Sequence, residues 1–245
     1  MKIVAYVLGE NVEKYIQPCL KSLLSFCDYI LYLDGKSVDK TIEKVMQLND
    51  ERIEIRTIPF EHWSKEANGK QRNNALNIIK EKFKGEKDVF VLRIDADEVV
   101  DDNGFRLKEL AEYGLKNDIG AFNINMEHFI YNLGLLDNTM NRHYVPLAFF
   151  KLTNYISYPE VEHPCLSNIK GRVKDSDICT IFHLRHALQL FDMKERYLNN
   201  LEKSNMHNKQ FLDAWYKNLI FGTYLVKRLD DIKRLPKQLK EEFLL

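Results

Sequence analysis

The sequence predicts an α/β domain with a mostly parallel central sheet flanked by helices, followed by a helical C-terminal extension. In the first part of the chain, short apolar runs alternate with longer segments of helical periodicity. This alternation is typical of parallel strands joined by right-handed crossovers. The apolar runs are nearly continuous, as in a sheet that is covered on both faces. From Leu188 the pattern is helical almost to the end, so we expect a domain over residues 1–186 and a helical extension packed on it over residues 187–245.

The individual elements follow from the spacing of apolar residues. Continuous or alternating apolar runs predict four strands in the first part, over residues 2–8, 29–33, 52–58 and 89–94. Apolar residues at helical spacing predict helices over residues 12–26 and 39–48, and a third helix marked by Ala75, Ile79 and Phe83 that ends near Gly85. After residue 118, three more strands are expected, over residues 121–131, 145–152 and 178–183.

The composition argues against some classes of protein. The 36 basic and 36 acidic residues give a formal net charge of zero, whereas nucleic-acid binders usually carry a clear positive excess. No apolar run approaches the roughly 20 residues that span a bilayer, and the N-terminal run is too short for a signal peptide, so we expect a cytoplasmic protein. The four cysteines form no C-x-x-C pair, which favours packed thiols over a disulfide or a zinc site.

The last part of the chain leaves two alternatives open. Apolar residues recur there at helical spacing with basic residues between them, at Leu229, Ile232, Leu235, Leu239 and Phe243. Such a helix can dock on its own domain, which we favour, or it can lie on a membrane surface as a peripheral contact.

The strongest chemical signal is Asp95-Ala96-Asp97, which directly follows the apolar run 89–94. In parallel sheets, ligands bind outside the carboxyl ends of the strands. Mg²⁺ and Mn²⁺ prefer carboxylate and water ligands and are often shared with substrate phosphates. A bound diphosphate would need such a cation, because two carboxylates alone would repel it. The alternative for an isolated D-x-D triplet is a solvated turn that caps a helix.

Three further motifs occur in the order that one family of enzymes uses. They are a turn containing Asn11, the segment Asp34-Gly35-Lys36-Ser37-Val38-Asp39-Lys40-Thr41, and the segment Gly69-Lys70-Gln71-Arg72-Asn73-Asn74-Ala75-Leu76. With the D-x-D triplet they resemble the family-2-type glycosyltransferases of the GT-A fold. That family has an Asn-containing turn, then D-x-x-S-x-D-x-T, then an R-N pair that opens a helix, then D-x-D. The resemblance covers the four predicted strands of the first part.

Some positions call for a separate interpretation. Ser37 and Asp39 match the family pattern, but from the residues themselves we favour a structural role as a tight turn and a helix N-cap. The chain departs from the pattern at Glu10, which stands before Asn11 where family members usually carry a basic residue.

The resemblance implies roles for the residues of a donor site. It places Asp34 at the nucleotide base as a hydrogen-bond acceptor, and Asn11 among the donor contacts. Arg72 corresponds to the arginine beside the donor phosphates, a task that suits a permanently charged, forked guanidinium; a surface salt bridge is its alternative. Asp95 would face the ribose or the metal, and Asp97 would be the principal ligand of a Mn²⁺ or Mg²⁺ ion.

The second half of the chain offers candidates for a catalytic base and for a further metal ligand. The family places its base, an Asp or Glu, in the part of the fold that holds Glu160-Val161-Glu162-His163-Pro164. We favour Glu162 over Glu160 as the base because Glu162 adjoins His163. His163 could instead position a substrate. The alternative for both glutamates is that they are exposed loop carboxylates without a catalytic role. His183 ends an apolar run where many GT-A enzymes add a histidine to the metal shell. The alternative is that the His183 ring only makes hydrogen bonds to the nearby backbone.

These residues together predict an inverting, metal-dependent glycosyltransferase. The donor would be a nucleotide-diphosphate sugar, a UDP-sugar by family habit, and the acceptor a saccharide or a lipid-linked molecule. One alternative is a non-catalytic sugar-nucleotide binding module. Another is a D-x-D phosphotransferase, but such enzymes carry the pair after their first strand, whereas here it follows the fourth.

Overall fold

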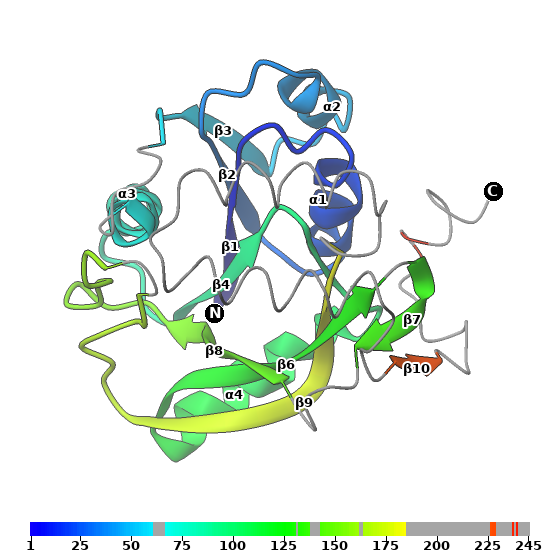
Figure 1. Ribbon diagram of the computed structural model, residues 1–245. Coiled ribbons are helices and arrows are strands. Elements are labelled where there is room, and N and C mark those ends of the chain that lie inside the picture. Colours follow the sequence, from blue (N-terminus) through cyan, green and yellow to red (C-terminus); the bar gives the residue numbers. More distant parts are fainter. Residues whose placement is uncertain are drawn as a thin grey trace, which may run out of the picture.

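The computed structural model describes residues 1–60, 67–130, 132–137, 143–161, 164–184 and 226–228, together with residues 237 and 239. The described strands form one ten-stranded, curled sheet (Figure 1). Helices α1 and α3 lie on opposite faces of its first half (Figure 1).

Four parallel strands form the first half of the sheet, in the order β3-β2-β1-β4. Their bounds are Lys2–Gly9 for β1, Tyr29–Asp34 for β2, Ile53–Thr57 for β3 and Val89–Asp95 for β4. The crossovers pass through three helices, α1 (Ile16–Leu24), α2 (Thr41–Met46) and α3 (Ala67–Lys82). The predicted alternation of strands and helices is therefore confirmed, with the bounds shifted by a few residues.

The second half of the sheet is mixed, so the prediction of a mostly parallel sheet was wrong there. Strand β8 (His143–Lys151) runs antiparallel to β4, and β6 (Ile119–Ile130) runs antiparallel to both β8 and β7 (Asn132–Asp137). Strand β9 (Arg172–His183) runs parallel to β6 and antiparallel to the short β5 (Glu98–Val100). An apolar run is compatible with either direction, because direction depends on which strands pair and not on local periodicity. In Figure 1 the long strands β6 and β9 curve across the end of the molecule that lies below β4.

Helix α4 (Leu107–Asn117) and the single 3-10 turn before it (Gly104–Arg106) were not predicted. The signal was present, because Leu107, Leu110 and Ala111 recur at helical spacing and are buried. The helix ends at Asn117 and is capped by Asp118, whose φ of 53° is the left-handed conformation common after helices.

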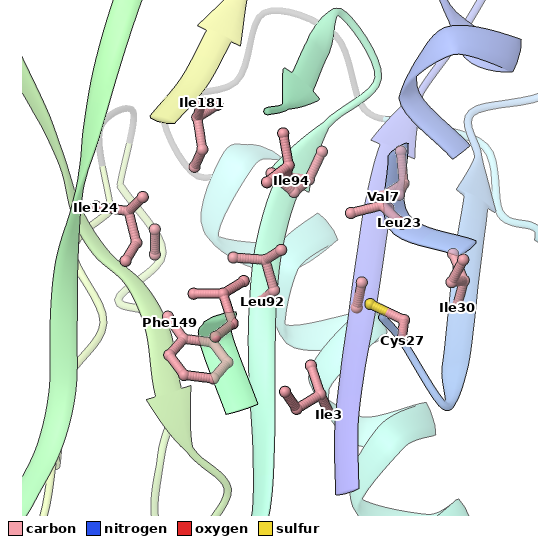
Figure 2. Close-up of a cluster of buried hydrophobic side chains, with 14 of the residues drawn as sticks. Ile3, Val7, Leu23, Cys27, Ile30, Leu92, Ile94, Ile124, Phe149 and Ile181 are labelled. Atoms are coloured by element: carbon pink, nitrogen blue, oxygen red, sulfur yellow. The ribbon is translucent and has the colours of Figure 1, made fainter. Parts of the chain in front are cut away.

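The core continues through both halves of the sheet. Alternate residues of a strand face opposite sides, so Ile3 and Val7 pack beneath α1, whereas Tyr6 packs on the side of α3. Figure 2 shows the α1 side, where the buried cluster extends from Leu23 past β1 and β4 to Ile124 on β6. The parallel strands, and the ends at which their polar residues lie, are therefore fixed by apolar packing on both faces.

Little of the predicted C-terminal extension lies within the described residues. Strand β10 (Val226–Arg228) pairs antiparallel with β7, within the region expected to be helical. Leu239 is fully buried in a cluster with Tyr15 and Phe182, and the amide of Lys237 donates a hydrogen bond to Asp102 (3.0 Å). These contacts favour a C-terminal segment docked on its own domain. The remaining predictions for residues 187–245 concern residues outside those that the structure describes.

Two further expectations can be compared with the described part of the chain. Within it, no helix is both long and apolar enough to cross a membrane. All four cysteines are free, and Cys19, Cys27 and Cys179 are buried as expected for packed thiols, whereas Cys165 is exposed.

Candidate functional site

The turns after β1 and β2 are joined by side chains that bind the backbone of the opposite turn. The Oδ1 of Asn11 accepts a hydrogen bond from the amide of Val38 (2.9 Å), and the amide of Asn11 donates to the Oγ of Ser37 (2.9 Å). The Oδ1 of Asp39 accepts a hydrogen bond from the amide of Thr41, the first residue of α2 (2.9 Å). Asp39 stands one residue before Lys40, the N-cap of this helix. Asn11, Ser37 and Asp39 thus have structural roles in shaping this edge.

Asp34 ends β2 and is only 1% exposed. Its carboxylate accepts hydrogen bonds from the amide of Lys36 (3.0 Å) and from the amide and the hydroxyl of Ser37 (3.1 and 2.5 Å). The hydroxyl of Tyr32 is a fourth donor, to Oδ1 at 3.5 Å, so the donors present match the roughly four lone-pair sites of a carboxylate. Asp34 therefore shapes its own turn and ties it to Tyr32 of the same strand.

Arg72 and Asp95 form an ion pair at the carboxyl end of β4. Asp95 is the last residue of β4, and Arg72 lies near the start of α3. The Nη2 of Arg72 donates to both carboxylate oxygens, at 3.1 and 3.2 Å, and the Arg72 side chain is 12% exposed. Burial, the largest single effect, acts to lower the pKa of Arg72, but the charge of Asp95 together with the contributions of Tyr6 and Tyr158 raises that pKa above its usual value. Arg72 is therefore not a surface salt bridge; it holds one of the two D-x-D carboxylates.

Two tyrosines that the sequence did not single out enclose Arg72. The hydroxyl of Tyr6 donates a buried hydrogen bond to that of Tyr158 (2.8 Å), and the Arg72 guanidinium lies 5.9 Å from the centroid of the Tyr158 ring. Among the described residues, the Nη1 of Arg72 is buried without a hydrogen-bond partner. Because buried donors in native proteins are nearly always paired, this nitrogen is suited to a ligand oxygen.

Asn73 attaches the loop that carries Tyr158 to helix α3. Its Nδ2 donates to the carbonyl oxygen of Tyr158 and its Oδ1 accepts from the amide of Tyr158, both at 2.8 Å. On the same helix, a Cβ at Gly69 would clash with the carbonyl oxygen of Pro159. The loop after Tyr158 is therefore pressed against the first turns of α3, beside Arg72.

Asp97 and His183, two of the predicted metal ligands, lie side by side. Asp97 occupies the turn between β4 and β5, where its carbonyl oxygen accepts a hydrogen bond from the amide of Leu184 (2.8 Å). The Oδ2 of Asp97 is 3.5 Å from the Nε2 of His183, and the side chains are 19% and 16% exposed. Asp95, the third predicted ligand, faces Arg72. Within the described ranges, no three acidic, histidine or cysteine side chains are grouped so that they could hold a metal ion by themselves.

Two further residues of this region carried no signal in the sequence. The buried Glu98 accepts a hydrogen bond from the amide of Asp95 (2.9 Å), and its burial, together with the charge of Asp95, raises its pKa to about 7. His128 lies opposite His183 in the register of β6 and β9, with the two Nδ1 atoms 3.0 Å apart. That pair depends on the register of two strands far apart in the sequence, so local periodicity could not reveal it.

The predicted catalytic carboxylates are only partly within the described residues. Glu162 and His163 lie outside them. Glu160 is exposed and, with Asn73 and Asn74 of α3, lines a cavity of about 510 Å³. The loop that holds all these candidates thus begins at Tyr158, in contact with Arg72.

Comparison with protein-family models and with curated proteins finds no match. Solved structures do match. TarS of S. aureus is 19% identical with a TM-score of 0.52, over 92% of this chain and 44% of the TarS chain. A structure of TarS residues 1–349 is 18% identical with a TM-score of 0.49, over 91% and 72% of the two chains. Glucosyl-3-phosphoglycerate synthase of Mycobacterium tuberculosis is 15% identical with a TM-score of 0.37, over 51% and 43%.

This chain spans less than half of the length of the first TarS structure, at 44%. At 19% identity, the likeness to TarS concerns the fold alone. The chain therefore has a mixed α/β architecture with a large curled sheet that is shared with TarS.

Proposed function

We propose that this chain is an inverting, metal-dependent glycosyltransferase. It would move a sugar from a nucleotide-diphosphate sugar, expected from the resemblance to be a UDP-sugar, to a hydroxyl of a saccharide or lipid-linked acceptor. The observation that carries the proposal is the placement of the two D-x-D carboxylates, with Asp95 paired to Arg72 and Asp97 beside His183. This arrangement offers a diphosphate a fixed positive charge and a place for a cation. The fold shared with TarS supports the same reading.

Asp97 and His183 fit a divalent cation as a pair of ligands. Two ligands in neighbouring octahedral positions, each ~2.1 Å from a Mg²⁺ ion, lie about 3.0 Å from one another. The two donor atoms here are 3.5 Å apart, so a small adjustment would suffice. Sites for Mg²⁺ often use one or two protein ligands together with waters and substrate phosphates, so two are enough. When bound, Mn²⁺ or Mg²⁺ would supply charge stabilisation for the departing diphosphate.

The residues of the chain account for the rest of the reaction. The buried Nη1 of Arg72 would bind a diphosphate oxygen while Asp95 holds the other side of the guanidinium. Asp34 would accept a hydrogen bond from the nucleotide base in place of its 3.5 Å contact with the Tyr32 hydroxyl.

A carboxylate in the loop after Tyr158, for which Glu162 and Glu160 are the candidates, would take the proton of the acceptor hydroxyl. The hydroxyl oxygen forms its bond to the anomeric carbon as the bond from that carbon to the diphosphate oxygen breaks on the opposite face. The configuration at the anomeric carbon therefore inverts.

The proposal is tested by thermal unfolding with UDP, GDP and dTDP, each with and without Mn²⁺, on the wild type and on Asp97→Ala. A ligand at a hundred times its dissociation constant adds about 2.7 kcal/mol to the free energy of unfolding. We expect one nucleotide to stabilise the wild type only with Mn²⁺, and Asp97→Ala to lose the effect. No stabilisation by any nucleotide would contradict the proposal.

Turnover provides the second test. In an assay of sugar transfer or donor hydrolysis, Asp97→Asn should lose more than about a hundredfold in rate, since each 1.36 kcal/mol of lost transition-state stabilisation is tenfold. Near-normal turnover by this variant would remove the metal from the mechanism. Nucleotide binding without turnover, even with water as acceptor, would instead identify a sugar-nucleotide binding module.

A further inference from the structure

We propose that His128 is a positioning residue that accepts a hydrogen bond from the Nδ1–H of His183 and so directs the Nε2 lone pair of His183 toward Asp97. The inference rests on the proposed function, in which Asp97 and His183 hold a divalent cation. It adds to that function a residue of β6 that does not itself touch the cation.

The geometry of the three side chains distinguishes the two contacts of His183. Its Nδ1 is 3.0 Å from the Nδ1 of His128, which is a hydrogen-bond distance, and the two rings meet edge to face at 84°. Its Nε2 is 3.5 Å from the Oδ2 of Asp97, which is longer than a good N–H···O hydrogen bond. The Nε2 of His183 and the Oδ2 of Asp97 are therefore spaced much as two ligands of one ion would be, whereas the Nδ1 of His183 is hydrogen-bonded to His128.

The hydrogen bond between the imidazoles restricts their tautomers. In a bond between two neutral imidazole nitrogens, one nitrogen carries the proton and the other accepts it. His183 can bind a cation through Nε2 only if its own proton is on Nδ1. The Nδ1 of His128 must then be the acceptor, which places the proton of His128 on its Nε2. Metal-binding histidines usually donate their other N–H to a neighbouring group that fixes the ring, and His128 occupies that place here.

The backbone holds the two histidines in this relation. His128 and His183 are directly paired in the parallel ladder of β6 and β9, and His183 also pairs with Glu98 of β5. The backbone of His183 is therefore fixed by strands on both sides of β9, but the orientation of its ring depends on side-chain contacts. We assign the orientation of this ring to His128.

The test is a titration with Mn²⁺, followed by the electron paramagnetic resonance of free Mn²⁺, on the full chain in the presence of UDP. His128→Leu removes the acceptor, and His128→Asn of nearly the same shape restores an acceptor oxygen near the position of Nδ1. Asn125→Leu is the matched control, because Asn125 donates to Thr180 (3.1 Å) in the same ladder without contacting His183. Loss of such a supporting partner typically weakens metal binding about 10- to 100-fold. We expect that loss for His128→Leu, with His128→Asn and Asn125→Leu close to the wild type.

The outcomes separate this inference from the proposed function. If the wild type and Asp97→Asn bind Mn²⁺ alike, the proposed cation site is wrong. If binding depends on Asp97 but His128→Leu binds as the wild type does, the cation site stands and the role of His128 is refuted. Should His128→Leu not fold, ¹⁵N-histidine NMR of the wild type with Mg²⁺ and UDP decides. A His128 protonated on Nε2, with its Nδ1 accepting from His183, supports the inference, and a His128 protonated on Nδ1 overturns it.

Discussion

Replacing Asn73 by alanine should destabilise the chain by detaching the loop after Ile156 from helix α3. Asn73 makes two hydrogen bonds to the backbone of Tyr158, each 2.8 Å long. Each such bond contributes about 0.5–1.5 kcal/mol net, so we expect a loss of about 1–3 kcal/mol in the free energy of unfolding. In a domain of roughly this size, each kcal/mol lowers Tm by about 2–4 °C. The Tm should therefore fall by about 2–12 °C. The loss should stay partial, because the Lys80 ammonium also donates to the carbonyl of Ile156.

The assay is urea unfolding followed by circular dichroism, with Asn77→Ala as the matched control. Asn77 lies on the same helix and is exposed, and its side chain makes no hydrogen bond to another described residue. A surface substitution of this kind changes stability by no more than about 0.5 kcal/mol. If Asn73→Ala is as stable as Asn77→Ala, the loop is not held by Asn73, and the account of how Tyr158 is kept beside Arg72 fails.

Three other predictions test an ion pair, a buried hydrogen bond and the packing of the core. Lys82, with Arg56 and Tyr29, lowers the pKa of Glu54 to about 2, below its unfolded value of about 4.3. The stability from this group is thus present above about pH 4.3 and is lost as the pH falls toward 2. Glu54→Gln should therefore be less stable than the wild type at pH 7 in urea unfolding, and a difference unchanged at pH 2 would contradict this. Tyr6→Phe leaves the buried Tyr158 hydroxyl without its partner and should cost about 1–3 kcal/mol. The double variant with Tyr158→Phe should lose less than the sum of the single losses, and strict additivity would argue against the pair. In the native chain, a thiol reagent should modify Cys165 rapidly and the three buried cysteines only on unfolding; fast reaction of more than one thiol would show that the core is not closed as described.

The parallel half of the fold could be predicted from the sequence because three of its four strands, β1, β2 and β4, are buried on both faces. Runs such as 89–94 are therefore apolar except for Arg93, and helix α1 carries a clear apolar stripe. The carboxyl ends of these strands meet at one edge, which is why Asp34 and Asp95 could be assigned to the same region. The first half of β9 is exposed and polar, so only its buried end, near 178–183, was predicted.

The contacts within the candidate site depended on tertiary structure. Arg72 could be expected near phosphates from its motif, but its bond to Asp95 follows from how α3 packs over β4. Tyr6 looks like any core residue of a strand, and its hydrogen bond to Tyr158 joins residues 152 positions apart. His128 meets His183 only because β6 and β9 pair in one register. None of these relations is visible as spacing along the chain.

The most direct test of the central claim is a crystal structure of the chain with UDP and Mn²⁺, in which the metal is located by its anomalous scattering. The account predicts one Mn²⁺ ion bound to Asp97 and His183, bridged to a diphosphate whose oxygen meets the Nη1 of Arg72. A nucleotide bound elsewhere, or an ion that avoids both Asp97 and His183, would contradict it.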